Sequence, residues 1–417
     1  MIEECFDVAV IGGGPAGMMA AGRAGESGAK VVLLEKNNRL GAKLLLTGKG
    51  RCNITQAEFD NRKFVEKFGQ GGDFLFSPLS LFGVKETIEF FEKRGLKLKT
   101  ERGQRVFPVS DKAQDALRVL MNYLQQNQVK IMTGVGVTGL RKKDKRIIKA
   151  ILRDQEVVAD KYIICTGGRA CPRSGSTGQG FLWAKKLGHA ITDLRPALTP
   201  LEIKEKWVKE AQGLSLKNVK IKVIQGGKKK EEAFGEALFT HFGLSGPIVL
   251  DLSKKVGELL KKGEVKLSID LKPALDFIKL DNRVQRDFKK YNNKLFRNSL
   301  DDLLPKKMVS IIAKLSGIKL EKKVNAITRQ ERNDLVRLLK NVEMTVSNVC
   351  GFDKAIVTSG GISLKEIDSR TMKSKLIDNL FFAGEIIDLD GPTGGYNLQL
   401  CWSTGYLAGQ SSAKRLT

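Results

Sequence analysis

The sequence predicts an α/β protein whose first domain is assembled from both ends of the chain and carries two insertions, one rich in β-strands and one helical. Three observations lead to this prediction. A glycine-rich loop joins an apolar strand to a small-residue helix within the first forty residues. Alternating strand patterns and then helical patterns occupy residues 196–341. Strand and glycine-turn patterns return beyond about residue 355, so we expect the chain to re-enter its first domain.

The first elements form a strand–helix–strand unit. Residues 6–11 and 31–34 are short apolar runs, as is typical of buried parallel strands. Residues 18–27 between them are mostly small and predict a helix that packs closely on the sheet.

The loop before this helix has the pattern G-x-G-x-x-G, formed by Gly12, Gly14 and Gly17. The first glycine permits a tight turn, the second lets a pyrophosphate approach the helix N-terminus, and the third allows close packing of helix and strand. Glu35 ends the next strand, 21 residues after Gly14, where an acid can hold ribose hydroxyls. This context predicts a Rossmann-type dinucleotide site. The alternative is a glycine-rich turn that binds nothing.

A second match to the same pattern, at residues 134–139, is not interpreted as a nucleotide loop. It follows a strand-like run at 129–132, but no helix follows it. Residues 141–146 instead predict a hairpin turn into another strand at 147–152.

The remaining elements divide the chain into three parts. We expect a first domain at 1–195 plus 355–417, a β-rich domain at 196–275 plus 342–354, and a helical insert at 276–341. The predicted elements are a helix over 114–126 capped by Asp111, strands at 162–165, 219–224 and 266–271, a helix at 306–315 with Pro305 in its first turn, and a helix through Lys340 that opens with the capping box Thr328–Glu331.

Composition narrows the class of protein. The 417 residues are 41% hydrophobic and 28% charged, which is enough for a core and argues against wholesale disorder. No apolar run approaches the roughly 20 residues that span a bilayer. Residues 1–4 (MIEE) include two acids instead of the basic start of a secretory signal. We therefore expect a soluble, cytoplasmic protein without membrane contact.

The charge is strongly basic. Lys and Arg number 72 and Asp and Glu 46, which gives a net charge of +26. Residues 1–200 and 201–350 each carry 13 excess basic residues, whereas 351–417 are balanced. A field of this size attracts polyanions and favours a nucleic-acid partner. The alternative is a lysine-rich surface that binds nothing.

Metal and disulfide chemistry have little support. The six cysteines form no C-x2-C or C-x4-C spacing, and His189 and His241 are the two histidines. We therefore expect no zinc site and mostly reduced, structural thiols.

Several further motifs together carry a resemblance to a known family. They occupy residues 12–17, 35–36, 41–43, 47–53, 166–168, 175–180, 239–247, 358–361, 371–375, 382–385 and 394–399. In this order they resemble the BaiN/RdsA-type family of bacterial FAD-dependent flavoproteins, whose members carry NAD(P)/FAD-dependent oxidoreductase and aminoacetone-oxidase names. The second glycine loop departs from the family pattern at Ala170, Cys171 and Gln179.

The resemblance implies a glutathione-reductase-like, FAD-binding Rossmann-type domain. Glu385 follows a predicted strand and could bind the ribityl chain, and the amides of the helix that opens near Gly395 could face the flavin N1/O2 edge. The cofactor-binding residues expected are Gly12, Gly14, Pro15, Ala16, Gly17, Glu35, Lys36, Lys43, Arg51, Cys52, Asn53, Val137, Thr166, Gly167, Gly168, Gly384, Glu385, Gly395, Asn397 and Leu398.

Two side chains are candidates for the chemistry. His241 lies in a turn that we expect to face the flavin across the domain junction, where it could protonate or orient the substrate. Cys52 could supply a catalytic thiol. For both residues a structural role is the alternative, and His189 is interpreted as structural.

The family implies two substrate classes, uridine in ribosomal RNA and unsaturated bile-acid intermediates. Both offer a carbon–carbon double bond conjugated with a carbonyl. The net charge favours ribosomal RNA and hence dihydrouridine synthesis. A reductase or oxidase of a small metabolite, such as a bile-acid-like enone or an amine, and a non-catalytic flavin-bearing RNA-binding factor are the alternatives. No second nucleotide domain is visible, so NAD(P)H is expected only as a transient electron donor.

Overall fold

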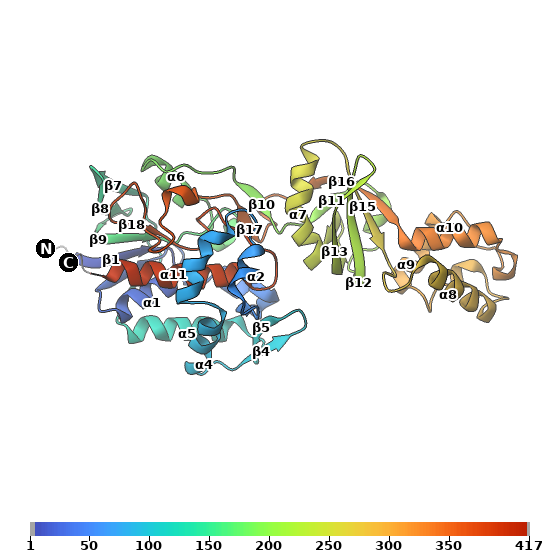
Figure 1. Ribbon diagram of the computed structural model, residues 1–417, viewed down its shortest axis with the longest axis horizontal. Coiled ribbons are helices and arrows are strands. Elements are labelled where there is room, and N and C mark those ends of the chain that lie inside the picture. Colours follow the sequence, from blue (N-terminus) through green and yellow to red (C-terminus); the bar gives the residue numbers. More distant parts are fainter. Residues whose placement is uncertain (1–4, 415–417) are drawn as a thin grey trace. The chain divides into compact units, whose positions relative to one another are not determined.

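The computed structural model describes residues 5–414, so the segment at 1–4 that argued against a secretory signal lies outside the described residues. The chain divides into two compact units (Figure 1). Unit 1 comprises Met1–Pro196 and Ile356–Thr417, and unit 2 comprises Ala197–Ala355.

Unit 1 is built on a seven-stranded sheet in the order β6-β2-β1-β9-β8-β7, with β18 also paired to β9. The strands are β1 (Cys5–Ile11), β2 (Val31–Leu34), β6 (Lys130–Met132), β7 (Gly139–Lys143), β8 (Arg146–Ile151), β9 (Glu156–Ile164) and β18 (Leu380–Phe382). β1, β2, β6, β9 and β18 pair in parallel, whereas β7 and β8 form an antiparallel hairpin. The C-terminal segment therefore adds a strand to a sheet begun by the N-terminal segment.

Unit 1 also contains several helices. They are α1 (Pro15–Glu26), α2 (Asn61–Glu66), α3 (Phe76–Leu81), α4 (Val84–Lys93), α5 (Ala113–Gln126), α6 (Gln179–Lys186) and α11 (Tyr396–Ala413). α1 and α11 lie side by side (Figure 1). A Cβ on Gly405 or Gly409 would lie only 2.5 or 2.3 Å from a carbonyl oxygen of α1. Glycine at these two positions is thus what allows the first and last helices to pack so closely.

Two small sheets complete unit 1. One is antiparallel and contains β3 (Thr55–Gln56), β5 (Arg105–Pro108) and β4 (Leu98–Glu101). The other pairs β10 (Arg195–Ala197) with β17 (Val357–Ser359), where the chain leaves unit 1 and returns to it.

Unit 2 contains a closed barrel in the order β11-β14-β13-β12-β15-β16. Its strands are β11 (Leu201–Ile203), β12 (Ser215–Gln225), β13 (Lys228–Phe239), β14 (Gly243–Ser245), β15 (Val265–Asp270) and β16 (Val342–Val349). In β12, Val219, Ile221 and Val223 are buried, and the alternate lysines point outward. Its helices are α7 (Pro247–Leu260), α8 (Phe277–Lys290), α9 (Lys306–Leu315) and α10 (Arg329–Lys340).

The predicted fold class is confirmed: a Rossmann-type α/β unit carries a β-rich and a helical insertion. The capping box of α10 is present, with Thr328 Oγ1 accepting the Glu331 N–H at 3.2 Å and Glu331 Oε2 accepting the Thr328 N–H at 2.7 Å. The cap assigned to Asp111 is wrong. Lys112 is the N-cap of α5, because the Asp111 carboxylate is drawn to Lys99 at 2.7 Å. Pro305 is the N-cap residue of α9 and does not belong to its first turn.

Within residues 5–414, no helix combines the length and the apolar character needed to cross a bilayer.

Candidate functional site

Most of the predicted cofactor residues lie at one edge of the central sheet. Ile11 is in register with both Leu34 and Ile164, and Phe382 is in register with Ile164. Because these strands are parallel, their carboxyl ends meet at the same edge. The loops that follow them are where open α/β sheets bind ligands.

The first loop has the geometry of a pyrophosphate site. Gly14 is the N-cap of α1, with φ −79° and ψ −175°, and no side chain caps the helix. A Cβ on Gly14 would meet no atom within 4 Å, whereas one on Gly17 would lie 1.8 Å from the Gly12 carbonyl oxygen. Gly17 is therefore required by packing. The space beside Gly14 stays open, and the backbone N–H groups of an uncapped helix end favour an anion there.

The carboxylate of Glu35 stabilises the same loop. Its Oε2 accepts the Gly13 N–H at 2.7 Å and its Oε1 accepts the Asn37 N–H at 2.8 Å, in a site where Glu35 is 8% exposed. Each carboxylate oxygen keeps a second lone pair with which it can accept a ribose hydroxyl.

The second glycine loop lies against the end of β2. Lys36 Nζ donates to Thr177 Oγ1 at 2.9 Å, and Asn37 Nδ2 donates to the Ser174 carbonyl at 3.1 Å. Partial burial lowers the pKa of Lys36. Gln179 opens α6 and donates to the carbonyl of Val137 at 3.3 Å. The residues that depart from the family pattern thus still form an ordered loop beside Glu35 and Lys36.

An ion pair and a threonine join the two ends of the chain. Lys43 Nζ lies 2.7 Å from Glu385 Oε2, and Glu385 Oε1 accepts the Thr358 N–H at 2.7 Å. The Thr358 hydroxyl oxygen in turn accepts the N–H groups of Arg169 and Ala170 at 2.7 and 2.9 Å. Thr358 is 1% exposed. It fixes the loop after β9 to the loop after β18, and it was not among the predicted site residues.

Close contacts also require glycine at two predicted positions in these loops. A Cβ on Gly168 would lie 2.3 Å from Thr358 Oγ1, and one on Gly384 would lie 2.7 Å from the Ala16 Cβ. Gly167 has a φ of +69°, in the left-handed region that glycine adopts without strain.

The N-terminus of α11 provides a second uncapped helix end. Gly395 is its N-cap with φ +107°, and no side chain caps it. Asn397 uses its side chain locally, since Oδ1 accepts the Gly391 N–H at 2.9 Å and Nδ2 donates to the Gly391 carbonyl at 2.8 Å. Leu398 is 9% exposed. The backbone amides at the start of α11 are thus held in place by the loop that precedes them.

Residues 51–53 have three different environments. Arg51 stacks over Phe107 at 4.0 Å and pairs with Glu101 at 2.9 Å, which holds its guanidinium against strands β5 and β4 of the small antiparallel sheet. Cys52 is fully buried, and burial raises the pKa of its thiol to about 12. A thiol with this pKa is almost entirely protonated at neutral pH, which favours the structural role for Cys52.

Two predicted residues contain buried polar atoms without a protein partner. Asn53 Oδ1 and Thr166 Oγ1 form no hydrogen bond within the part of the chain that the structure describes. Buried oxygens of this kind are usually paired, and an unpaired one indicates a missing ligand or water.

His241 belongs to unit 2 and lies in the turn between β13 and β14. The turn is tight, since Thr240 N–H donates to the Gly243 carbonyl at 2.8 Å. The His241 ring is exposed and stands edge-on to Phe242 at 4.8 Å. It forms no hydrogen bond or ion pair with any residue between 5 and 414. Its imidazole is thus available to an external group.

His189 has a structural environment. It is 2% exposed, its Nε2 lies 2.8 Å from Ser374 Oγ, and its ring packs against Phe382 at 5.0 Å. Burial lowers the pKa of His189, so its imidazole is neutral at pH 7.

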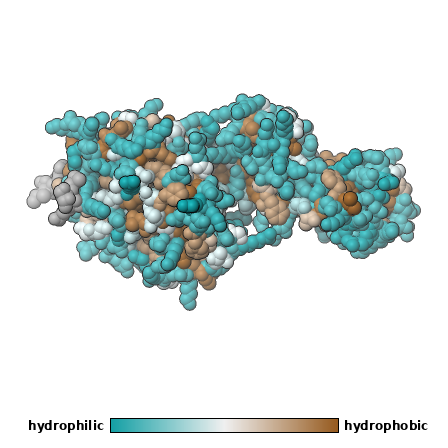
Figure 2. Space-filling view, in the orientation of Figure 1, coloured by the Kyte–Doolittle hydropathy of each residue, from teal (hydrophilic) through white to brown (hydrophobic). Residues whose placement is uncertain are grey.

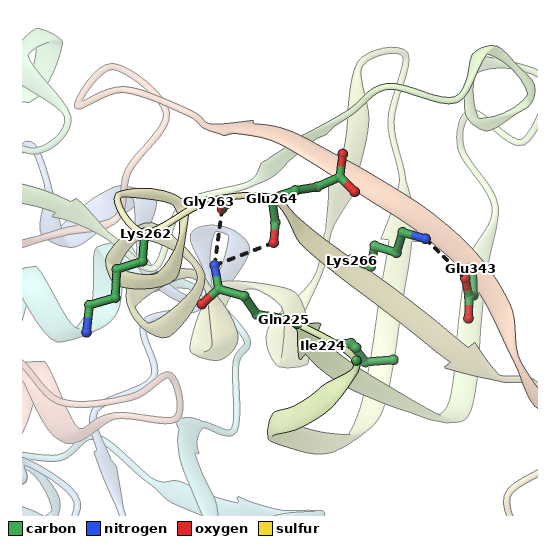
Figure 3. Close-up of a pocket in the computed structure, with 9 residues that line it drawn as sticks. Ile224, Gln225, Lys262, Gly263, Glu264, Lys266 and Glu343 are labelled. Atoms are coloured by element: carbon green, nitrogen blue, oxygen red, sulfur yellow. Dashed lines mark hydrogen bonds and ion pairs between the residues drawn. The ribbon is translucent and has the colours of Figure 1, made fainter.

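A surface pocket of about 610 Å³ lies in unit 2, between the β12–β13 turn and the start of β15 (Figure 3). Gln225 Nε2 donates to the carbonyls of Gly263 and Glu264, and Lys266 pairs with Glu343 at 3.8 Å (Figure 3). These lining groups satisfy one another, and none of the predicted catalytic or cofactor residues lines the pocket.

Comparison with solved structures establishes the fold. The 3-ketosteroid-Δ4-(5α)-dehydrogenase of Rhodococcus jostii RHA1 aligns with a TM-score of 0.54 and 15% identity, covering 99% of this chain and 97% of that one. The FrdA chain of Escherichia coli quinol fumarate reductase aligns with a TM-score of 0.55 and 17% identity, covering 99% and 70%.

Curated relatives match over nearly the full length. The 3-dehydro-bile acid Δ(4,6)-reductase of Clostridium scindens is 34% identical and covers 98% of this chain and 99% of its own. The ribosomal RNA dihydrouridine synthase of Escherichia coli is 28% identical and covers 98% of both chains. The Haemophilus influenzae protein of the same name is 26% identical, with coverages of 97% and 98%.

The residues of unit 1 fit FAD. The open space at Gly14 and the uncapped ends of α1 and α11 suit its anionic groups, and the buried oxygens of Asn53 and Thr166 suit its hydrogen-bond donors. The HI0933-like Rossmann-domain family model matches residues 6–411, which is most of the chain. This protein belongs to the HI0933-like family of FAD-dependent oxidoreductases with a Rossmann-type domain.

Proposed function

We propose that this protein reduces a carbon–carbon double bond conjugated with a carbonyl, and that its substrate is uridine in ribosomal RNA. Held by the loops of unit 1, FAD would supply a hydride for the β carbon, with NAD(P)H as its source of electrons, and the protein would supply a proton for the α carbon. The curated relatives support this chemistry, because one is named a Δ(4,6)-reductase of a 3-dehydro-bile acid and another a synthase of dihydrouridine, which differs from uridine by two added hydrogens.

The protein's own residues have three tasks in this proposal. The loops after β1, β9 and β18 bind and orient the cofactor, with Gly14 beside its pyrophosphate and Glu385 near its ribityl chain. The Thr358 and Lys43 contacts keep Glu385 in one position. His241 donates the proton or holds the developing enolate oxygen, a role that its exposed and unpaired imidazole supports.

The observation that carries the choice of substrate is the net charge of +26. Half of the excess belongs to residues 201–350. A steroid gains little from such a field, whereas folded RNA gains from the release of counterions when its phosphates are neutralised. The target uridine must also leave its stack to reach the flavin, at a cost of a few kcal/mol that phosphate contacts elsewhere can offset.

The direct test is mass spectrometry of ribosomal RNA nucleosides from cells with and without this protein. We expect dihydrouridine to disappear from ribosomal RNA in the deletion strain and to return when the gene is restored. Unchanged dihydrouridine content in ribosomal RNA would contradict the RNA substrate.

A small enone is the second candidate, because the 34% identity to the bile-acid Δ(4,6)-reductase exceeds that to either dihydrouridine synthase. Anaerobic mixing of the reduced protein with a 4,6-dien-3-one steroid distinguishes the two. Rapid reoxidation of the flavin by the steroid, without any effect of RNA, would favour the small substrate.

The role of His241 has its own test. His241→Ala should slow flavin reoxidation by the substrate by ~10²–10⁴-fold, the usual range for a lost general acid. Flavin reduction by NAD(P)H should change little, because that half-reaction does not use this proton. Reoxidation within a few-fold of the unmodified protein would instead support a structural role for His241.

A further inference from the structure

Two segments of the helical part of unit 2 form a strongly basic surface. Residues 289–298 and 319–325, named here the basic surface, contain seven lysines and arginines and one acid. These seventeen residues thus hold a net charge of +6 out of +26 for the whole chain. Such a density is much higher than the average for this sequence.

The backbone brings the two segments together. Leu295 and Lys323 form an antiparallel bridge. Phe296 N–H donates to the Lys322 carbonyl at 2.8 Å, and Val324 N–H donates to the Lys294 carbonyl at 3.0 Å. The side chains of Phe296 and Val324, one from each segment, are buried. The charges are therefore carried on a packed and hydrogen-bonded support.

Three of the seven cations have nearby acids. Lys290 lies 2.7 Å from Asp302, Lys322 lies 2.7 Å from Glu331, and Arg297 lies 4.0 Å from Glu321. The other four, Lys289, Lys294, Lys319 and Lys323, are exposed and have no ion pair with any acid among residues 5–414. Lysines near the C-terminal end of α8 interact favourably with the helix dipole, which could explain their presence without a ligand. Lys294, Lys319 and Lys323 lie outside the helices, so the helix dipole does not explain them.

The chemistry of the basic surface indicates which anion it suits. It includes the exposed amide side chains of Asn292, Asn293, Asn298 and Asn325, which can donate to phosphate and sugar oxygens. None of the large exposed apolar side chains of the described chain belongs to it, so it offers nothing to insert into a membrane. Figure 2 shows that the visible face of this helical part is largely hydrophilic.

We propose that the basic surface binds the phosphate backbone of RNA, with Lys289, Lys294, Lys319 and Lys323 as the phosphate-contacting residues. This inference rests on the proposed function, because it assigns the surface that would hold the RNA substrate. Contacts of this type fix the position of an RNA without reading its sequence. The paired Lys290 contributes less than its neighbour Lys289, because Asp302 already neutralises it.

The test compares two quadruple variants of the full-length, FAD-loaded protein in binding to protein-free bacterial ribosomal RNA. One variant carries Lys289→Glu, Lys294→Glu, Lys319→Glu and Lys323→Glu. The control carries Lys206→Glu, Lys217→Glu, Lys228→Glu and Lys230→Glu, four exposed lysines elsewhere in unit 2 that also have no acidic partner among the described residues. Both variants change the net charge equally.

Each phosphate contact makes the fall of log K with log salt steeper by about 0.7–0.9. This corresponds to a roughly 5–8-fold higher affinity at 0.1 M salt than at 1 M salt. Loss of four contacts should lower affinity on the order of 10³-fold and reduce the slope by about 3. The control variant should retain affinity within roughly 10-fold, and both variants should keep their flavin spectrum and circular dichroism.

Equal losses of RNA affinity in the two variants would show that the protein's overall positive charge attracts the RNA, without a special role for the basic surface. This result would overturn the inference. Unchanged RNA binding by the first variant would also overturn it, while leaving the proposed function intact. Failure of the unmodified protein to bind ribosomal RNA at low salt would instead contradict the proposed function itself.

Discussion

Gly14 gives a test in which protein stability and cofactor affinity are expected to respond differently. Gly14 is the N-cap of α1, its φ of −79° suits any residue, and a Cβ there would meet no atom within 4 Å. Aspartate is a preferred N-cap residue and also interacts favourably with the helix dipole. Gly14→Asp should therefore change the unfolding free energy of the apoprotein by less than about 1 kcal/mol.

The same substitution should strongly weaken cofactor binding. If the pyrophosphate of FAD lies at this helix end, the new carboxylate is placed about 4 Å from a phosphate charge. At an effective dielectric constant of about 20, two such charges repel by ~4 kcal/mol. That is close to a 10³-fold weaker Kd.

The assay is quenching of FAD fluorescence on titration of the apoprotein, together with urea unfolding of the same samples. Gly14→Asn is the matched control, since it has the same shape and capping ability without the charge, and should bind FAD at least ~10-fold more tightly than Gly14→Asp. Equal FAD affinity in Gly14→Asp and the unmodified protein would refute the assignment of the loop. Gly17→Ala, whose Cβ would lie 1.8 Å from a carbonyl oxygen, should by contrast destabilise the apoprotein by at least ~2 kcal/mol.

Three further predictions concern stability and reactivity. Lys340 pairs with the nearly buried Asp270 at 2.7 Å, so Lys340→Met should lower the free energy of unfolding in urea by ~3–5 kcal/mol. Adding Asp270→Asn to this variant should restore part of the loss. Burial lowers the pKa of His189 in the folded protein, so as the pH falls below about 6.5 the imidazole is protonated in the unfolded chain before it is protonated in the folded one. The free energy of unfolding should therefore fall from pH 7 to 5, and it should fall less steeply in His189→Gln. With a thiol pKa raised to about 12, Cys52 should resist iodoacetamide at pH 8, whereas exposed Cys5 should react; peptide mass spectrometry showing equal labelling would contradict the buried position.

The local parts of the fold could be predicted because their signals are local. The loop from Gly12 to Gly17, the hairpin turn of β7 and β8, and the capping box of α10 each depend on residues within a few positions of one another. The structure contains each of them close to where the sequence places it. Periodicity and turn chemistry suffice for such elements.

Other features depend on partners that are distant in the sequence. Thr358 acts on the backbone of Arg169 and Ala170, 189 and 188 residues away, and no local pattern marks that role. Asp111 failed as a helix cap because Lys99 and Arg51 attract its carboxylate. Closure of the barrel through β11 and β16 joins segments more than a hundred residues apart. Such contacts are decided by tertiary packing, which single-sequence patterns do not report.

The contacts of Glu385 have a thermodynamic consequence for the whole of unit 1. Glu385 belongs to the returning C-terminal segment, yet its carboxylate is held by Lys43 from the N-terminal segment and by Thr358. FAD binding at these loops would therefore require both segments to be in place. A ligand that binds only the assembled state stabilises it by RT ln(1 + [L]/Kd), about 2.7 kcal/mol at a hundredfold excess over Kd. It follows that FAD should protect the amides of β18 and of the start of α11 from hydrogen exchange as strongly as those of β1, although more than 350 residues separate these elements in the sequence.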